Sequence, residues 1–107
     1  MGDTNYFSGT VKLLGNPIQK LIKQKTLRTR VWVELAQFRQ NRLILVTFWG
    51  KLGDEVKNFY QINDYIFIEG YTSIEKTNLK LNKIVLTGLR VYPLFFDLRS
   101  AQKKQVN

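Results

Sequence analysis

Hydrophobic and polar residues alternate along most of the chain with a period of two, which is typical of strands that bury one face. The alternation predicts five strands, over residues 6–14, 30–38, 43–49, 65–75 and 79–91. In the second strand, Val31, Val33 and Leu35 share one face. Trp32 and Phe38 therefore lie on the other face, away from the predicted core.

The third strand divides in the same way. Its inward side chains are predicted to be Ile44, Val46 and Phe48, and its outward ones Leu43, Leu45, Thr47 and Trp49. Outward Leu43 and Leu45 fit a buried interface better than a wet surface. In the fourth strand Tyr71 lies on the outward face by the same alternation.

A short helix is predicted between the third and fourth strands. Residues 50–53, with two glycines, break the third strand, and the carboxylates at 54–55 suit the positive end of a helix. Val56, Phe59 and Tyr60 follow at helical spacing, and the helix ends near residue 62. We expect this apolar stripe to pack against the open end of a barrel.

The remaining segments are connections. The basic segment 18–29 is predicted to be a long loop or a frayed edge strand, and residues 76–78 a hairpin turn. The last strand is expected to bend at Gly88. We expect residues 1–96 to form one domain, followed by a flexible basic tail at 97–107.

Five strands with one short helix between the third and fourth is the order of an OB-fold barrel, so the predicted fold class is all-β. The length of 107 residues fits one domain, and the hydrophobic content of 44% is that of a globular chain. No apolar run approaches the ~20 residues of a membrane span. We also expect no targeting leader, so that the protein acts in the compartment where it is made.

The charge is strongly positive and unevenly distributed. The formal net charge is +9, and no acidic residue lies between Asp3 and Glu34. That window holds six cations: Lys12, Lys20, Lys23, Lys25, Arg28 and Arg30. Focused positive charge of this kind favours a polyanionic partner over a merely solvated surface.

Residues for catalysis are scarce. The chain has no cysteine and no histidine, and its eight carboxylates are scattered. Residues 50–53 lack the spacing of a phosphate-binding loop and are interpreted as a strand-end turn. We therefore expect a protein that is not an enzyme and that needs no cofactor or metal.

Two blocks of the sequence carry a family resemblance. Phe48-Trp49-Gly50-Lys51-Leu52, the predicted helix and Tyr65-Ile66-Phe67-Ile68-Glu69-Gly70 follow in order, and Val11-Lys12-Leu13-Leu14-Gly15-Asn16 precedes them. This arrangement resembles the bacterial single-stranded DNA-binding protein family over roughly residues 6–92. The small, tail-less form also looks like plastid-encoded algal relatives, or like the related primosomal OB-fold protein.

The resemblance implies largely sequence-independent binding of single-stranded DNA in replication, recombination or repair. It also implies a homo-oligomer, a dimer or tetramer, assembled through first-strand edges and sheet packing. The expected compartment is a plastid if the chain is organelle-encoded, and otherwise the bacterial cytoplasm. The chain departs from the family in its short connections and in ending without an acidic, Phe-terminated tip, which puts recruitment of the usual partner enzymes in doubt.

Single-strand binding combines cations for the backbone with aromatic platforms for the bases. The predicted platforms are Trp49, Trp32, Tyr71 and Phe38, with Trp49 at the position before Gly-Lys where the family places a stacking aromatic. The predicted phosphate contacts are Lys12, Arg28, Arg30, Arg42, Lys51 and Lys80. Tyr65, Phe67, Phe59 and Tyr60 are instead expected to pack.

Two alternatives remain open at this level. An RNA-binding OB module would use the same fold and the same stacking. A primosome or replisome assembly factor would place the outward aromatics in protein interfaces instead.

Overall fold

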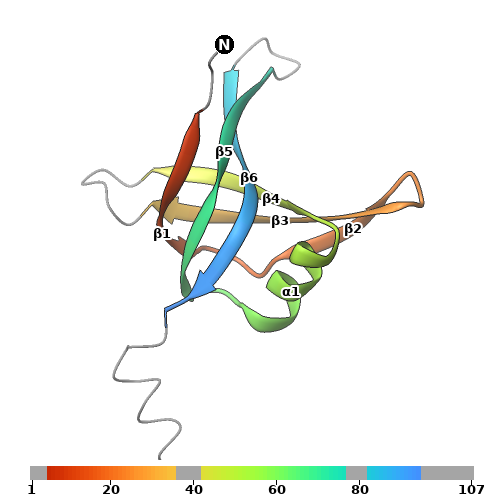
Figure 1. The fold of residues 1–107 in the computed structure, drawn as a ribbon, viewed down its shortest axis with the longest axis horizontal. Coiled ribbons are helices and arrows are strands. Elements are labelled where there is room, and N and C mark those ends of the chain that lie inside the picture. Colours follow the sequence, from red (N-terminus) through yellow and green to blue (C-terminus); the bar gives the residue numbers. More distant parts are fainter. Residues whose placement is uncertain (1–4, 36–41, 77–81, 95–107) are drawn as a thin grey trace, which may run out of the picture.

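The computed structural model describes residues 5–35, 42–76 and 82–94, and Figure 1 shows its arrangement. Its elements are β1 (Tyr6–Leu13), β2 (Ile18–Ile22), β3 (Thr26–Leu35), β4 (Leu43–Trp49), α1 (Lys51–Phe59), β5 (Tyr65–Lys76) and β6 (Asn82–Pro93). Phe38, Lys80 and the predicted tail at 97–107 lie outside the described residues.

The strands close into a barrel. The sheet runs β1-β5-β6-β4-β3-β2, and a further pairing of β1 with β3 joins its two sides. The neighbours are antiparallel except for β4 and β6, which run parallel. With β2 set aside as an added strand, this is a five-stranded OB barrel with one helix after its third strand, as predicted.

Of the two alternatives predicted for residues 18–29, a long loop or a frayed edge strand, the structure has the edge strand. This segment forms β2 and the start of β3, which pair from Ile18↔Arg30 to Ile22↔Thr26. The two strands make a hairpin arm, β2–β3, that reaches away from the barrel (Figure 1). Most of the arm beyond the barrel is solvated on both faces, so polar residues interrupt the period-two pattern there.

The barrel interior is filled by aliphatic side chains around one aromatic. Phe48 is fully buried at its centre. The rest of the core consists of Val11, Leu13, Val31, Val33, Leu35, Val46, Val56, Ile66, Ile68 and Leu86. The core residues of β3 and β4 are inward residues that the alternation predicted, whereas Ile44, also predicted to point inward, is only partly buried.

Helix α1 begins at Lys51, three residues earlier than predicted, because Gly50 turns the chain with a φ of 67°. Val56 is fully buried, and Leu52 and Tyr60 pack against the core beside it. Phe59 does not take part, since its side chain is 74% exposed, and its predicted packing was wrong. The buried stripe follows the four-residue spacing of Leu52, Val56 and Tyr60, which turns Phe59 towards solvent.

The same packing affects the ionisation of Tyr60. Burial, with the nearby negative charges of Glu55 and Asp64, raises the pKa of the Tyr60 hydroxyl above its usual value. The phenol is therefore neutral at physiological pH.

The last two strands pair over their full length, with one irregularity. Gly70 pairs with Gly88 and Glu69 with Arg90, so the register shifts at Leu89. The irregularity expected at Gly88 is therefore present, and it lets the long β5–β6 pair curve around the barrel. Lys76, predicted to lie in the hairpin turn, is instead the last residue of β5 and pairs with Asn82. Residues 77–81 lie outside the described residues. None of the helical residues that the structure describes forms a segment long and apolar enough to cross a membrane.

Candidate nucleic-acid interface

The outward side chains of β3 and β4 form one continuous surface, here called the β3–β4 face. Across the antiparallel pair, Arg28 lies opposite Trp49, Arg30 opposite Thr47, and Trp32 opposite Leu45. Opposite residues on antiparallel strands point to the same side of the sheet. The register therefore brings four predicted site residues, two Trp and two Arg, onto one surface.

Strands β2 and β6 extend this face on either side. Lys20 of β2 lies opposite Arg28. On β6, Val85 lies beside Leu45, and Lys83 is two residues earlier on the same face. The face is thus bordered by a lysine on each of its flanking strands.

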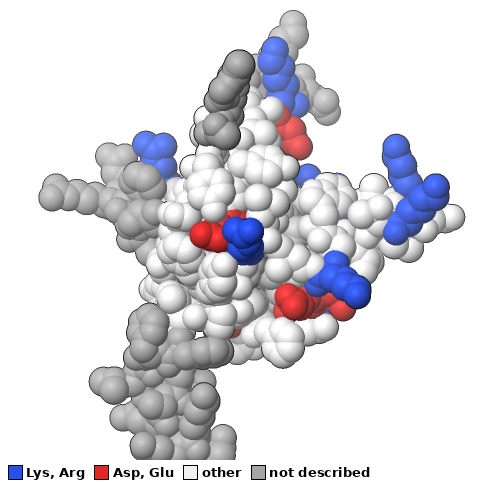
Figure 2. Space-filling view, viewed as in Figure 1, with Lys and Arg blue, Asp and Glu red and all other residues white. Residues whose placement is uncertain are grey.

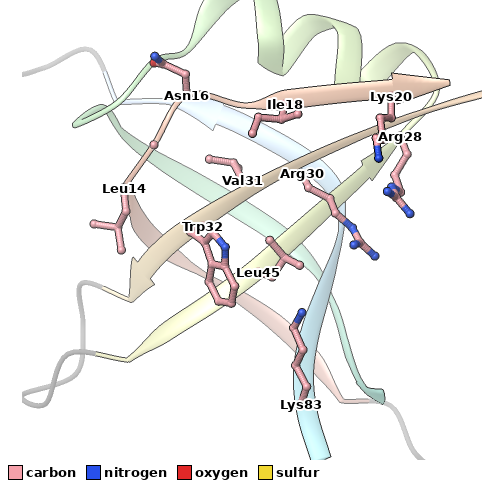
Figure 3. A pocket seen from close by; sticks show the side chains of 11 residues that line it. Leu14, Asn16, Ile18, Lys20, Arg28, Arg30, Val31, Trp32, Leu45 and Lys83 are labelled. Atoms are coloured by element: carbon pink, nitrogen blue, oxygen red, sulfur yellow. The ribbon is translucent and has the colours of Figure 1, made fainter. Parts of the chain in front are cut away.

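A groove of about 500 Å³ is hollowed into the β3–β4 face (Figure 3). Its lining residues are Leu14, Gly15, Asn16, Ile18, Lys20, Arg28, Arg30, Val31, Trp32, Leu45 and Lys83. Four of these are cations and none is a carboxylate, while Val31 and Leu45 add an apolar surface. Such a lining suits a ligand that is anionic on one side and apolar on the other, as a nucleotide is.

Trp32 forms one wall of the groove. Its side chain is 47% exposed, and the Lys83 Nζ lies 5.5 Å from the centroid of its ring. At that distance the ammonium is attracted to the ring face. Trp32 is thus half open to solvent and lies next to a cation, and sites that bind single strands combine exposed aromatics with cations.

Leu45 lies beneath this wall. Its side chain is only 6% exposed, so the prediction of an outward leucine available to a partner was wrong for Leu45. Trp32 on one neighbouring strand and Val85 on the other flank it. Leu43, by contrast, is exposed as predicted.

Arg30 is held in place by its neighbour across the sheet. Its Nε donates a hydrogen bond to the Thr47 Oγ1 at 3.3 Å. The remaining guanidinium N–H groups are directed along the groove, where Arg28, Lys20 and Lys83 also end (Figure 3). A positioned guanidinium is a good donor to phosphate oxygens.

Trp49 lies at the other end of the face, where β4 ends and α1 begins. It is 45% exposed and lies opposite Arg28. Lys51 follows as the first residue of α1 and is exposed. The second tryptophan thus lies about four residues along β4 from the position opposite Trp32, roughly 14 Å away.

The hairpin arm carries cations without carboxylates beside them. Figure 2 shows blue side chains without red ones at the end of the β2–β3 arm, whereas blue and red lie side by side over α1. The arm carries Lys20, Lys23, Lys25 and Arg28, and α1 carries Asp54 and Glu55 beside its lysines. The arm therefore attracts anions more strongly than the helix does.

The other predicted contacts that the structure describes lie away from the groove. Lys12 is on β1, opposite Glu34 and Tyr65, with its Nζ 5.8 Å from the centroid of the Tyr65 ring. Arg42 precedes β4, and its carbonyl accepts the Leu35 N–H. Tyr71 is on β5, one strand beyond β6, and is exposed.

The two β5 aromatics that were expected to pack differ. Phe67 is partly buried, with its ring centroid 6.1 Å from that of Tyr92. Tyr65 is about half exposed, beneath the Lys12 ammonium.

Two cations of the groove were absent from the predicted site. Lys20 lies within the acid-free window, so the charge pattern contained a signal for it. Lys83 had none, because only the parallel pairing of β4 with β6 places it beside Trp32. Within the described ranges, no three His, Cys, Asp or Glu side chains come together as metal ligands would.

Known proteins resemble this chain in sequence and in fold. No protein-family model matches the chain. A relative from Trieres chinensis, named "Putative single-stranded DNA-binding protein ycf41", is 28% identical over 103 residues, which is 87% of this chain and 91% of the relative.

Solved structures share the fold. The single-stranded DNA-binding domain of a Synechococcus protein superimposes with a TM-score of 0.72 at 18% identity, covering 86% of this chain and 98% of that one. A deletion mutant of the Thermus aquaticus single-stranded DNA-binding protein gives a TM-score of 0.74 at 15% identity, over 87% of this chain and 42% of that one. The chain thus has the OB fold of single-stranded DNA-binding domains. Its resemblance to that family, first drawn from residues 48–52 and 65–70, is confirmed along most of its length.

Proposed function

We propose that this protein binds single-stranded DNA without sequence preference, through the groove on its β3–β4 face. The bases stack on Trp32 and Trp49, and Arg28 and Arg30, with Lys20 and Lys83, neutralise the phosphates. The observation that carries the proposal is the groove itself, which combines four cations, an apolar floor and a half-exposed tryptophan with no carboxylate in its lining. The name of the Trieres chinensis relative supports it.

Contacts outside the groove remain predictions. Lys51 lies close enough in sequence to Trp49 to extend the site. Lys12, opposite Glu34 of β3, and Arg42, just before β4, flank the Trp32 end of the β3–β4 face. Tyr71 would be reached only by a strand that crosses β6 to β5. A role in replication, recombination or repair, and action in a plastid, also remain predictions. We propose binding without catalysis, because the sequence contains neither histidine nor cysteine.

The test uses the two tryptophans, which are the only ones in the chain, as reporters. Titration with oligo-dT at low salt is expected to quench their fluorescence. Trp49→Phe leaves Trp32 as the single reporter, and Trp32→Phe leaves Trp49, while each keeps an aromatic ring for stacking. Unquenched fluorescence and no binding in either variant at low salt would overturn the proposal.

Truncation then measures the stacking. Trp32→Ala and Trp49→Ala should each weaken binding by ~1–3 kcal/mol, the usual contribution of one stacked base. Phe59→Ala is the matched control, because Phe59 is an exposed aromatic on α1, away from the groove. Competition between DNA and RNA oligomers of equal sequence separates this proposal from an RNA-binding module.

We further propose that the protein forms a homo-oligomer through the outer face of β1, β5 and β6. Tyr6 on β1 and Tyr71 on β5 lie opposite each other there, and both are exposed. The Phe67 ring on β5 and the Tyr92 ring on β6 lie 6.1 Å apart on the same face. The Arg90 guanidinium pairs with the Glu69 carboxylate at 3.4 Å, which neutralises this face. Aromatic residues with few net charges are typical of protein interfaces.

A further inference from the structure

The Lys83 ammonium lies over the Trp32 ring although a carboxylate is within its reach. Its Nζ is 5.5 Å from the centroid of the ring. Glu75 lies opposite Lys83 on the antiparallel pair β5–β6, close enough for the two side chains to form an ion pair. Among the described residues, however, Lys83 is paired with no carboxylate. The ammonium is therefore held at the ring face by its attraction to the indole.

The surface beneath Lys83 explains this position. Leu45 and Val85 lie side by side on β4 and β6, and both are almost fully buried although they point to the outer side of the barrel. The Lys83 side chain extends from β6 towards Leu45 and the Trp32 ring (Figure 3). Its aliphatic stem can follow this apolar surface while the ammonium stays in the groove. Both parts of the side chain thus have suitable surroundings in the free protein.

A base and the Lys83 ammonium cannot share this face of the Trp32 ring. Non-bonded heavy atoms in contact lie about 3.5–4.0 Å apart, so an ammonium above a stacked base would be at least about 7 Å from the indole plane. The Lys83 Nζ is 5.5 Å from the ring centroid, so it is no more than that distance above the plane. Stacking on this face therefore requires the ammonium to move.

The contact between Lys83 and Trp32 is weak enough for a base to replace it. A cation over an exposed ring changes an equilibrium by about two- to fivefold, whereas one stacked base changes it by about five- to 150-fold. Lys83 has a long, flexible stem and is partly exposed, so the ammonium can leave the ring without a change in the backbone. Once displaced, it remains in the groove, where a phosphate of the bound strand would attract it.

We propose that Lys83 is a displaceable cover of Trp32. In the free protein it occupies one face of the ring, and a base that stacks on that face displaces it, after which the ammonium pairs with a phosphate. Lys83 is thus a positioning residue that acts through Trp32, in addition to neutralising the strand. This inference rests on the proposed function, because it assumes that bases stack on Trp32.

The salt dependence of binding tests the displacement. The parent is the Trp49→Phe chain, whose single tryptophan is Trp32. Lys83→Ala removes a phosphate contact and the cover together. Lys20→Ala is the matched control, because Lys20 also lines the groove but has no ring contact among the described residues.

Both variants should bind oligo-dT more weakly than the parent at low salt, with the slope of log affinity against log salt less steep by about 0.7. At high salt the phosphate contacts contribute little. There Lys83→Ala is expected to bind about two- to fivefold more tightly than the parent, because the base no longer displaces a cation. Lys20→Ala should bind no more tightly than the parent at any salt concentration.

Acrylamide quenching of the free chains measures the cover directly. Acrylamide is uncharged, so its access to the Trp32 ring does not depend on the charge of the groove. Lys83→Ala should raise the quenching constant of Trp32 relative to the parent, since it opens the ring face over which the ammonium lies. Lys20→Ala should leave this constant unchanged.

The outcomes separate this inference from the proposed function. If the two variants respond alike at every salt concentration and to acrylamide, Lys83 is an ordinary phosphate contact and the cover is wrong. A rise in acrylamide quenching without tighter binding at high salt would show that the base uses the other ring face, which overturns the displacement. If oligo-dT neither binds at low salt nor quenches Trp32 or Trp49 in the single-tryptophan chains, the proposed function itself fails.

Discussion

Gly53 is a residue at which local preference and packing conflict. Glycine is among the poorest helix formers, and alanine at an exposed helix position would be favoured by about 1 kcal/mol. Gly53 is nevertheless buried in α1 against β3, and a Cβ added there would lie 2.4 Å from the Thr29 Oγ1 and 2.8 Å from the Thr29 Cβ. The absence of a side chain lets the helix approach the strand that carries Arg28 and Arg30.

We therefore expect Gly53→Ala to destabilise the fold by about 1–3 kcal/mol despite its better helix propensity, because the short Thr29 side chain cannot move away. Urea unfolding of the variant measures this loss.

A second substitution checks the cause. Thr29→Ala in the Gly53→Ala background should restore part of the stability, since it removes the nearest clashing atom, the Thr29 Oγ1, while the Cβ stays. The gain is partial also because the Gln19 Nε2 then loses its 3.1 Å hydrogen bond to the Thr29 Oγ1. A Gly53→Ala variant as stable as the unmodified chain would contradict the close approach.

At the scale of elements, the β2–β3 arm is closed by a two-residue hairpin turn that has unusual residues at its centre. The Lys25 N–H donates to the Ile22 carbonyl at 3.1 Å, and the two residues between them, Lys23 and Gln24, have φ values of 53° and 60°. Both lie in the left-handed region, where side chains other than those of Gly, Asn and Asp are disfavoured. The chain keeps a cation at this tip at a cost in backbone energy.

Replacing Lys23→Asn together with Gln24→Gly should relieve that cost. We expect the free energy of unfolding to rise by about 1 kcal/mol, because Asn-Gly is the preferred pair when both central residues of a hairpin turn have positive φ. The urea midpoint of the double variant measures the gain. Gln24→Ala is the control and should give none, since alanine also disfavours the left-handed region; an equal gain from both variants would point to a cause other than φ.

At the scale of the whole molecule, the barrel separates two kinds of surface. The β3–β4 face and the arm carry the cations of the groove, whereas the outer face of β1, β5 and β6 carries aromatics and a neutralised ion pair. In the barrel order β5 is separated from β3 by β1 and from β4 by β6, so the aromatics of β5 lie away from the groove and both surfaces can be occupied together. An oligomer could therefore bind single-stranded DNA through the β3–β4 faces of its subunits while the outer faces of β1, β5 and β6 form the contacts between them.

The prediction at this scale concerns assembly. Tyr6→Ser with Tyr71→Ser should lower the mass measured in solution towards that of one 12.6 kDa chain, because it removes two exposed rings from the proposed interface. Phe59→Ser on α1 should leave the mass unchanged. A chain that is monomeric before any substitution, with and without oligo-dT, would show that this face makes no homo-oligomer.

Much of the fold could be predicted from the chain itself. Alternation places Val33, Val46 and Ile68 in the core, and the barrel order follows from the strands and one helix, because a strand with one buried face must repeat every two residues. The sequence-based predictions failed for segments that are only partly buried. The arm is largely solvated on both faces, so its strands lack that repeat, and Phe59 lies at helical spacing but at the margin of the buried stripe.

The basic, aromatic character of the binding surface was determined by the sequence alone. The segment between Asp3 and Glu34 without acidic residues, and the alternation that turns Trp32 and Trp49 outward, depend only on residue order. The tertiary structure decided which of these residues meet. Strand register places Arg30 against Thr47 and Trp32 against Leu45, and the parallel pairing of β4 with β6 brings Lys83 to Trp32 from about fifty residues away. Pairing across a barrel is a long-range choice, made by the packing of all strands together, so the groove exists only in the folded chain.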